Sequence, residues 1–303
     1  MSRIVTRDFV DGLTTGYRND FNKALAAAQP KYPRLAMVVD SQNESEDYSW
    51  LGATAVPREW TDERVPRGLR GFHFEIVNKK YENTIEVDRT AMEDDKLGQI
   101  PPRIRDLATR AAMHPDYLIT QLLNGAFSTA CYDGSYLCAD AHSEGDSGSQ
   151  DNAETHKLDA TYLPAAITAM MNFKDDQGQV IGIEPDLLVV GPENLFNARK
   201  LLNSAQITVS GSEALVTQSS TMNGVLDLLV LPGLSTNYWF VMATKQYLKA
   251  LIFQWRIKPE FTAVTDPNSE GVFDSDVFKY GTRSRCAAGY GDWRYIFGST
   301  GAA

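Results

Sequence analysis

The feature that most constrains the fold is a long helical pattern from Pro101 to Phe127. Pro101 and Pro102 suit the first turn of a helix, where the missing N–H has no bond to lose. The apolar stripe keeps its phase through Pro115, so the pattern predicts one helix, kinked near His114 and Pro115. At roughly 1.5 Å per residue, it would span on the order of 35 Å, enough to support a domain. Its apolar or small positions are Ile104, Leu107, Ala108, Ala111, Leu118, Ile119, Leu122 and Ala126.

A strand and an acidic turn precede this helix. Apolar and polar residues alternate from Glu82 to Arg89, which predicts a half-buried strand, and Glu93 to Asp95 form the turn. Nearer the start, residues 7–28 carry a stripe typical of an amphipathic helix that ends before Pro30. This stripe consists of Phe9, Leu13, Tyr17, Phe21, Ala24, Leu25 and Ala28.

Composition bounds the class of protein. A chain of 303 residues with 43% hydrophobic content can bury one large core or two modest ones. It has no apolar run of about 18 residues, so a soluble protein made in the cytosol is expected. Lys and Arg number 29 against 39 Asp and Glu, a net charge of -10, which argues against tight binding to phosphate backbones. Three cysteines are too few for a disulfide framework.

A charged segment with prolines and glycines, residues 57–71, interrupts two strand patterns. One strand pattern ends at Leu51, and alternation returns at Phe72, Phe74 and Ile76. Two strands that leave and re-enter around such a segment describe a long projecting hairpin. An ordinary surface loop explains the same spacing, and both interpretations remain open.

The second half of the chain predicts another subdomain. Residues 186–190 form a buried strand that breaks at Gly191 and Pro192 and leads into a helix through Leu202, which is a strand-turn-helix unit. A short helix is expected over 161–173. Residues 205–224 are polar and irregular, and further strands are expected over 225–231, over 238–243 and from Leu251 to the end.

Candidate chemical groups form no convincing site. Cys131, Cys138, His142 and His156 suggest a metal site, but the two cysteines are spaced more widely than in a zinc knuckle. A nucleophilic pair of Cys131 and His142 lacks a helix start after the cysteine. The interpretation that remains is a buried thiol or a loop thiol.

Other motifs also fail on spacing. The acidic clusters at residues 44–47 and 93–95 lack the pattern of a calcium loop, and Gly289 and Gly291 do not form a dinucleotide fingerprint. The C-terminal tail is rich in aromatic residues, which could stack on nucleic-acid bases. Without a basic groove, these side chains are expected to pack in the protein core instead. They are Tyr280, Tyr290, Trp293, Tyr295 and Phe297. We therefore predict no catalytic, cofactor-binding or metal-binding residues and no cofactor. Two kinds of function remain. One is an enzyme whose site is assembled from scattered residues, and the other is a structural protein that associates with itself.

An ordered series of motifs along nearly the whole chain resembles one family, the major head (capsid) subunits of Mu-like tailed bacteriophages. The loop after Cys131 departs most from the family pattern. The motifs are LTTGYRNDF, AMVVDS, YSWLG, VPREWTDER, KKYENTIEVDRTAMEDDKLG, PDYLITQLLNGAFSTACYDG and KYGTRSRCAAGYGDWRYIFG.

The resemblance implies an α+β chain with the Hong Kong 97-like major capsid protein fold. That fold has an N-terminal arm, an extended loop, a peripheral domain with a long spine helix, and an axial domain around the capsomer axis. The extended loop maps to Tyr48–Asn83 and the spine helix to Pro101–Phe127. The implied domains are the arm (1–33), the extended-loop region with peripheral strands (34–100), the spine helix and following loop (101–159), the axial domain (160–245) and the return strands with the tail in the peripheral domain (246–303).

The implied function is that of a major capsid protein, not an enzyme. It would assemble in the host cytoplasm, as hexamers and pentamers, into the icosahedral virion head that encloses double-stranded DNA, with no membrane involved. The acidic balance suits a shell that must release its DNA. A portal, a separate scaffolding protein and, optionally, a decoration protein are the expected partners. An encapsulin-like shell holding cargo is the first alternative, and a soluble enzyme is the second.

The resemblance also implies where subunits touch. The segment around Trp60 has too little apolar content for a core of its own, so it should pack on a neighbouring subunit. The polar stretch from Ala205 to Gly224 should lie at the tip of the axial domain. The expected contact residues are Arg58, Trp60, Arg64 and Arg67 in the loop and Phe9 and Tyr17 in the arm.

Overall fold

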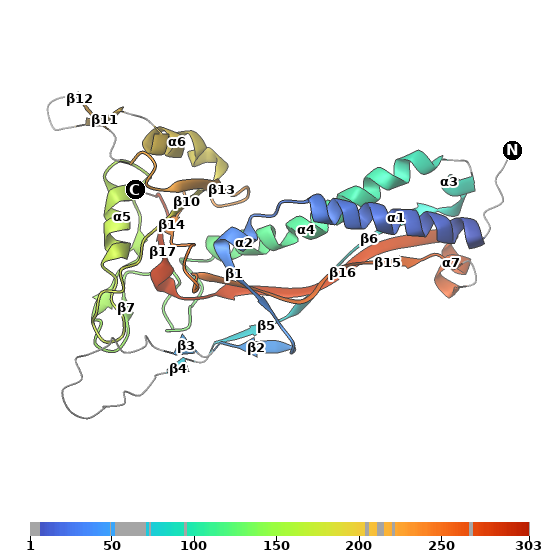
Figure 1. Ribbon diagram of the computed structural model, residues 1–303, viewed down its shortest axis with the longest axis horizontal. Helices are drawn as coiled ribbons and strands as arrows, with labels where there is room; N and C mark the ends of the chain where they lie inside the picture. The colour runs from blue at the N-terminus through green and yellow to red at the C-terminus, as the bar shows by residue number, and fades with distance from the viewer. Residues whose placement is uncertain are drawn as a thin grey trace.

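The computed structural model describes residues 7–48, 50–51, 71–72, 74–93, 96–203, 206–210, 215–219, 222–266 and 269–302. Helices are interspersed with runs of consecutive strands that pair mostly antiparallel, which confirms the α+β class. Figure 1 shows a long body, in which helices lie along a sheet of long strands, and an end body, in which a second sheet lies between helices. Among the residues above, none of the helices combines the length and apolar character that a membrane span needs.

The sheet of the long body has the order β1-β15-β16-β6, in which β1 is parallel to β15 and the other pairs are antiparallel. The strand predicted over Glu82–Arg89 is confirmed as the end of β6, except that Arg89 is the first residue of α3. The β15–β16 register shifts on both sides of Ile257, close to Pro259, because proline cannot donate to a regular ladder. The strands are β1 (Ala36–Asp40), β6 (Lys79–Asp88), β15 (Leu251–Val264) and β16 (Val277–Tyr290).

Helix α4 (Ile100–Asn124) is the predicted long helix, and it continues through Pro115. Its stripe is buried on both sides of that proline, at Ile104 before it and Ile119 after it, so packing compensates for the lost hydrogen bond. The kink itself stays a prediction. The expected end at Phe127 was wrong by three residues, because tight turns closed by bonds such as Ser128 N–H to Gly125 O (3.0 Å) follow Asn124.

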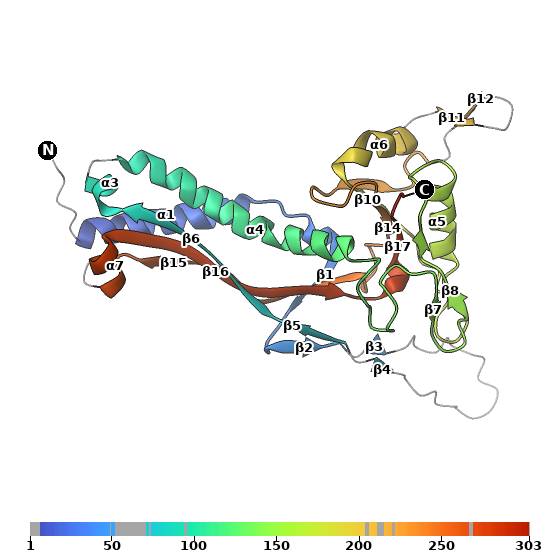
Figure 2. The same ribbon diagram turned by 180° about the vertical axis from the view of Figure 1, so that it is seen from behind.

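The N-terminal helix α1 (Arg7–Ala27) confirms the amphipathic helix expected there, and it packs along α4 on the same face of the sheet (Figure 2). Between the two helices and the far half of the sheet lies a separate apolar cluster. Its largest members are Tyr17, Phe21, Ile104, Leu107, Phe278 and Tyr280.

Short helices connect these elements. The predicted acidic turn begins as helix, since Glu93 is the last residue of α3. Asp94 and Asp95 lie outside the described residues. The short helices of the long body are α2 (Tyr32–Leu35), α3 (Arg89–Glu93), η1 (Lys96–Gln99) and α7 (Glu270–Ser275).

The end body contains a five-stranded sheet with the order β13-β10-β14-β17-β9. All residues of β10, β14 and β17 are buried, which explains why their sequences read as continuous apolar runs. The strands predicted over 186–190, 225–231 and 238–243 are confirmed with shorter bounds. The strands are β9 (Ala153–Glu154), β10 (Leu187–Val190), β13 (Asp227–Val230), β14 (Trp239–Met242) and β17 (Ile296–Ser299).

Two helices and a hairpin flank this sheet. Figure 1 shows the β11–β12 hairpin projecting from the end body beyond α6. The expectation that residues 205–224 are irregular was wrong, because β11 and β12 pair in antiparallel register from Gln206↔Ser219 to Ser210↔Leu215. The elements are α5 (Tyr162–Met171), η2 (Pro192–Asn194), α6 (Leu195–Asn203), β11 (Gln206–Ser210) and β12 (Leu215–Ser219).

The C-terminal stretch divides between the two sheets. Residues 246–303 were expected to return to the peripheral domain as one unit, and β15 and β16 do lie in the long body. The last strand, β17, instead pairs with β14 in the end body, after the turn η3 (Trp293–Tyr295). The domain boundaries as a set stay a prediction.

Candidate assembly surfaces

The predicted hairpin leaves the long body as a two-part antiparallel stem (Figure 1). Tyr48 N–H donates to Phe74 O (2.7 Å) between the two pairs of strands. The stem confirms strands that leave and return around residues 52–70. The predicted contacts Arg58, Trp60, Arg64 and Arg67 lie outside the described residues. The stem strands are β2 (Ser45–Asp47), β3 (Trp50–Leu51), β4 (Gly71–Phe72) and β5 (Glu75–Val77).

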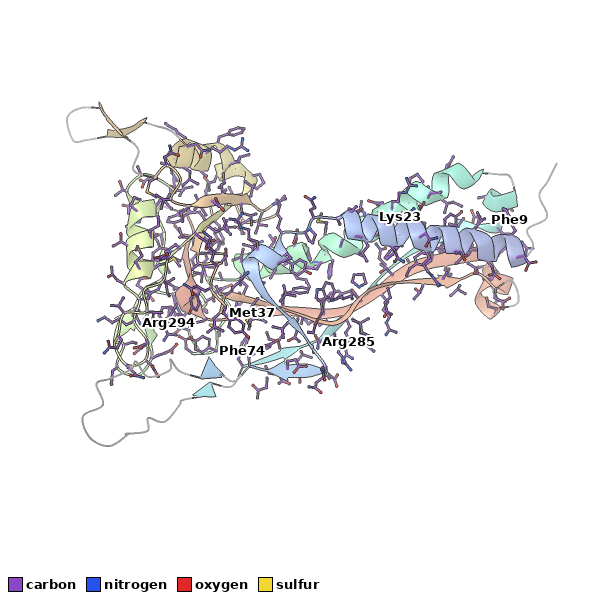
Figure 3. The ribbon with its side chains drawn as sticks, in the orientation of Figure 1. Phe9, Lys23, Met37, Phe74, Arg285 and Arg294 are labelled. Carbon is purple, nitrogen blue, oxygen red and sulfur yellow. The ribbon has the colours of Figure 1, made fainter. Side chains whose placement is uncertain are left out.

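Apolar contacts seat the stem on the face of the sheet opposite α4. Ile76 of β5 packs against Ile252 and Ala287, with Met37 and Phe74 beside them (Figure 3). Gly289 makes this approach possible, because a Cβ there would lie 2.4 Å from Ile76 Cδ1. The stem is therefore part of the subunit's own core.

Buried hydrogen bonds fix the stem in place. The Gln254 amide of β15 donates to Ile76 O (3.0 Å) and Asn78 Oδ1 (2.9 Å), and it accepts a bond from the Tyr48 hydroxyl (2.9 Å). Asn78 donates in turn to Ser41 Oγ (2.7 Å). Since Gln254 is fully buried, losing one of these partners would leave a polar group unsatisfied.

Glu46 organises the turn that enters the stem. Its Oε1 atom accepts from Gln42 N–H (2.7 Å), Asn43 N–H (3.0 Å) and Ser41 Oγ (2.9 Å). The backbone bonds from Asn43 and Gln42, followed by the bond from Ser41, lower the pKa of Glu46 to about 2. The acidic run at residues 44–47 thus contains a turn-forming carboxylate.

The two predicted contacts in the arm lie within the subunit. Tyr17 is only 4% exposed and meets Tyr280 edge to face, with ring centroids 5.3 Å apart. Phe9, near the start of α1, is half-buried beside the same cluster (Figure 3). Both side chains anchor α1 to its own sheet, and contact with a neighbour stays a prediction.

Charged groups from other elements hold the joint between α1 and β1. The Asp116 carboxylate of α4 accepts from Lys31 N–H (2.8 Å) and Tyr32 N–H (2.7 Å) at the start of α2. Lys249 Nζ donates to the carbonyls of Pro33 (3.0 Å) and Arg34 (3.0 Å) at its end. The carboxylate lies at the N-terminal end of α2 and the ammonium at its C-terminal end, so both complement the dipole of α2. Together they fix the path of the chain between α1 and β1.

The cysteines and histidines do not come together as a site. Cys131 and Cys138 are buried, and burial raises the pKa of both thiols, which disfavours a nucleophilic thiolate. His142 bonds instead to Asp133 (2.6 Å) and stacks on Trp293 at 4.1 Å. No cluster of three or more potential metal ligands occurs in the part of the chain that the structure describes.

Sequence reasoning missed a buried ionic cluster in the end body. Arg294 donates to Glu144 (2.7 Å) and Asp292 (3.3 Å), and the Tyr132 hydroxyl donates to Glu144 (2.6 Å). Burial disfavours the Arg294 charge, but Asp292, Tyr132 and Glu144 outweigh this effect and raise its pKa. Burial raises the pKa of Asp292. The available signal was Asp292 and Arg294 inside an otherwise apolar tail.

Buried hydrogen bonds of Asn152 act together with this cluster to order the loop after α4. Asn152 is fully buried and donates to Leu137 O (2.8 Å) and Trp293 O (3.1 Å). A small hairpin closes the loop, and it lies at the lower end of the end body in Figure 1. Its strands are β7 (His142–Ser143) and β8 (Ser149–Gln150).

Comparisons with known proteins agree with this architecture. The family described as Mu-like prophage major head subunit gpT matches residues 10–156, 151–234 and 230–302. The FluMu major head subunit of Haemophilus influenzae is 30% identical over 96% of this chain and 72% of that protein. The major capsid protein of Escherichia phage Mu is 28% identical over 96% of this chain and 73% of its own length.

A solved structure agrees in three dimensions. The procapsid subunit of bacteriophage JBD30 matches with a TM-score of 0.60 and 27% identity, over 98% of this chain and 76% of that one. This confirms the Hong Kong 97-like fold. The matched proteins are named for heads and capsids rather than for an enzyme or a cargo shell. The chain therefore belongs to the family of Mu-like prophage major head subunits and is a major capsid protein of a Mu-like phage.

Proposed function

We propose that this major capsid protein assembles, as hexamers and pentamers, into a closed head around double-stranded DNA through its extended hairpin. The observation that carries this proposal is the stem, which is seated on its own sheet by Ile76 and Gln254. A long loop whose stem is fixed on its own sheet supports a contact between the rest of that loop and a neighbour.

The loop tip supplies the contact in this proposal. Trp60 lies among the charged residues Arg58, Arg64 and Arg67, in a segment too polar for a core of its own. Burying an indole of roughly 200 Å² at about 25 cal/mol per Å² gives an upper bound near 5 kcal/mol per subunit. The three arginines would surround that anchor with bidentate donors for carboxylates of the neighbour.

The arm contributes differently. Tyr17 acts through its contact with Tyr280, which orients α1, whereas Phe9 lies closer to the start of the helix, where a neighbour could extend the same cluster. Phe9 is therefore the proposed arm contact and Tyr17 its support.

The other proposed partners follow from the resemblance and the charge. A net charge of -10 suits a shell that encloses DNA without gripping it. A portal, a separate scaffolding protein and a decoration protein would join the shell, with assembly in the host cytoplasm.

The experiment is to express wild-type subunit and Trp60→Asp with the phage's other head proteins, and to image the products by electron microscopy. Wild type should form closed heads, whereas Trp60→Asp should give a folded subunit without heads. Tyr247→Asp, at a position 87% exposed in another segment, is the matched control. Normal heads from Trp60→Asp would refute the role of the hairpin, and absence of wild-type heads would refute shell assembly.

A further inference from the structure

A buried histidine in the loop after α4 has a hydrogen-bond acceptor beside each of its ring nitrogens. His142 is fully buried, and its Nδ1 atom lies 2.6 Å from Asp133 Oδ2. Its Nε2 atom lies 3.2 Å from Asn152 Oδ1. A neutral imidazole has one N–H group and one lone pair, so it can donate to only one of these two oxygens. Both contacts are hydrogen bonds from the ring only when it carries two protons.

The orientation of the Asn152 amide is fixed by its other partners. Its Oδ1 atom also accepts a hydrogen bond from Ala139 N–H (2.8 Å). Turning the amide round would place its oxygen against carbonyl oxygens and its NH₂ group against that N–H, which costs several hydrogen bonds at once. The oxygen beside His142 Nε2 is therefore set by the fold. The carbonyls that face Asn152 Nδ2 are those of Leu137 (2.8 Å), Trp293 (3.1 Å) and Ile296 (3.2 Å).

The proton shared with Asp133 belongs to the imidazole. A carboxylate is the weaker base of the two groups. Asp133 Oδ1 in addition accepts Ser135 N–H (3.0 Å), and a bond of this kind favours the ionised carboxylate. The Asp133 side chain is only 4% exposed, so water screens the pair weakly. An imidazolium paired with a carboxylate satisfies every one of these contacts.

The charge of the surroundings favours the same state. The buried carboxylates of Asp133 and Glu144 lie in one network with Asp292, and within the described residues Arg294 is the only other cation bonded to them. Burial raises the pKa of Asp292. Even with Asp292 protonated, two carboxylates face one guanidinium, and a charged His142 balances them. Asp151 also interacts with the charge of the ring. Its own acidic neighbours are Asp140 and Glu154.

The ring joins the loop to the C-terminal tail. His142 stacks on Trp293 of η3, with centroids 4.1 Å and planes 7° apart, and a cation over an indole face is attracted to it. Trp293 Nε1 donates in turn to Glu144 Oε1 (2.9 Å). Asn152, the second partner of the ring, holds the tail through the carbonyls of Trp293 and Ile296. Losing one proton would therefore disturb contacts on both segments.

We propose that His142 is a buried imidazolium whose second proton latches residues 132–152 to the C-terminal tail, and that loss of this proton at alkaline pH loosens the loop. The folded chain then binds one proton more than the unfolded chain, in which an ordinary histidine is neutral above about pH 6.5. The stabilisation is thus complete below that pH and declines as the pH rises. The latch lies within one subunit.

Nuclear magnetic resonance of unassembled subunits labelled with ¹⁵N-histidine tests the protonation state. The chain has four histidines. The signal of His142 is the one that persists when His73, His114 and His156 are each replaced by Gln in turn. At about pH 7.5, where an ordinary histidine is mostly neutral, both of its nitrogens should carry a proton. One bare nitrogen at that pH, in a folded subunit, would overturn the proposal.

Amide hydrogen exchange followed by mass spectrometry tests the latch. Corrected for the intrinsic rate, the protection of residues 132–152 should fall about tenfold between about pH 6 and about pH 9, because a hydrogen bond from a charged group is lost. The buried strand β10 is the internal control and should keep its protection. Wild-type protection of the loop that does not change with pH would overturn the latch.

Matched histidine variants separate this latch from a general effect of pH. His142→Gln should lower the protection of the loop at about pH 6 and remove its pH dependence. His156→Gln, at a ring that is 39% exposed and bonded to Glu154, should retain the pH dependence of the wild type. Equal pH dependence in His142→Gln and wild type would overturn the proposal. If His142→Gln does not fold, the resonance and exchange measurements on the wild type decide it.

Discussion

The two halves of β15 differ in how many faces are covered. Leu251–Trp255 are all buried, because one side of the strand joins the main core and the other lies under the hairpin stem. From Arg256 to Val264 exposure alternates, because α1 and α4 cover only one face. One strand thus forms a two-sided hub near the end body and a one-sided platform in the far half of the long body. The hub fixes the hairpin, and the platform leaves one face of the strand exposed.

The largest contrast should come from truncating a side chain in each half. Phe253→Ala in the hub should lower the free energy of unfolding by about 3–5 kcal/mol, because the side chain is fully buried. Val264→Ala on the platform, at a position 48% exposed, should change it by less than about 0.5 kcal/mol. Urea unfolding of unassembled subunits measures both. Equal losses would mean that the halves do not differ as described.

A charge substitution should sharpen the comparison between the end body and the platform. Arg294→Met leaves Glu144 and Asp292 buried without their cation and should cost about 3 kcal/mol. This loss is at the low end for a broken buried ion pair. The raised pKa of Asp292 makes its protonation easier, and a protonated Asp292 would leave one buried charge fewer. Arg283→Met is the control, at an exposed position of β16 that pairs with Glu260 of the platform. Urea unfolding that shows similar small losses for both variants would contradict a stabilising role for the cluster.

A smaller effect should come from the contact that seats the stem. Gly289→Ala places a Cβ against Ile76 Cδ1 and should cost about 1–3 kcal/mol. Ile76→Val removes that atom, so the double variant should lose less than the sum of the single variants. The same unfolding assay gives the coupling energy. Strict additivity would show that the stem does not lie against Gly289.

The smallest effect should be the pH dependence of the turn at Glu46. Its pKa is lowered in the folded chain to about 2, so its contribution to stability is complete above its unfolded pKa, near 4.5, and disappears as the pH falls toward 2. The stability difference between wild type and Glu46→Gln should therefore shrink between about pH 6 and about pH 3. A constant difference across this range would show that hydrogen bonds to the charged carboxylate do not hold the turn.

The elements with strong local periodicity could be predicted from the sequence. The stripe through Pro115 indicated one continuous helix, and the apolar runs at 186–190 and 238–243 indicated buried strands. These patterns depend on which face each element buries, and that information is local. The resemblance added the order of the domains, which periodicity alone does not contain.

Features that depend on distant partners could not be predicted. The ionic cluster joins Glu144 to Arg294, 150 positions apart, and the apolar surroundings of Arg294 in the sequence do not indicate which distant residue it pairs with. Gln254 likewise looked like an ordinary polar strand residue, yet it is the buried donor that holds the stem. The β11–β12 hairpin was missed although Gln206–Ser210 alternates between polar and apolar residues, because Leu215–Ser219 does not alternate and the surrounding stretch is polar.

A cryo-electron microscopy map of assembled particles tests the central claim most directly. The account predicts that Ile76 and Gln254 keep the stem on its own sheet, while the tip with Trp60 lies on a neighbouring subunit in both pentamers and hexamers. A map in which the tip folds back onto its own subunit, with Trp60 away from any neighbour, would contradict it.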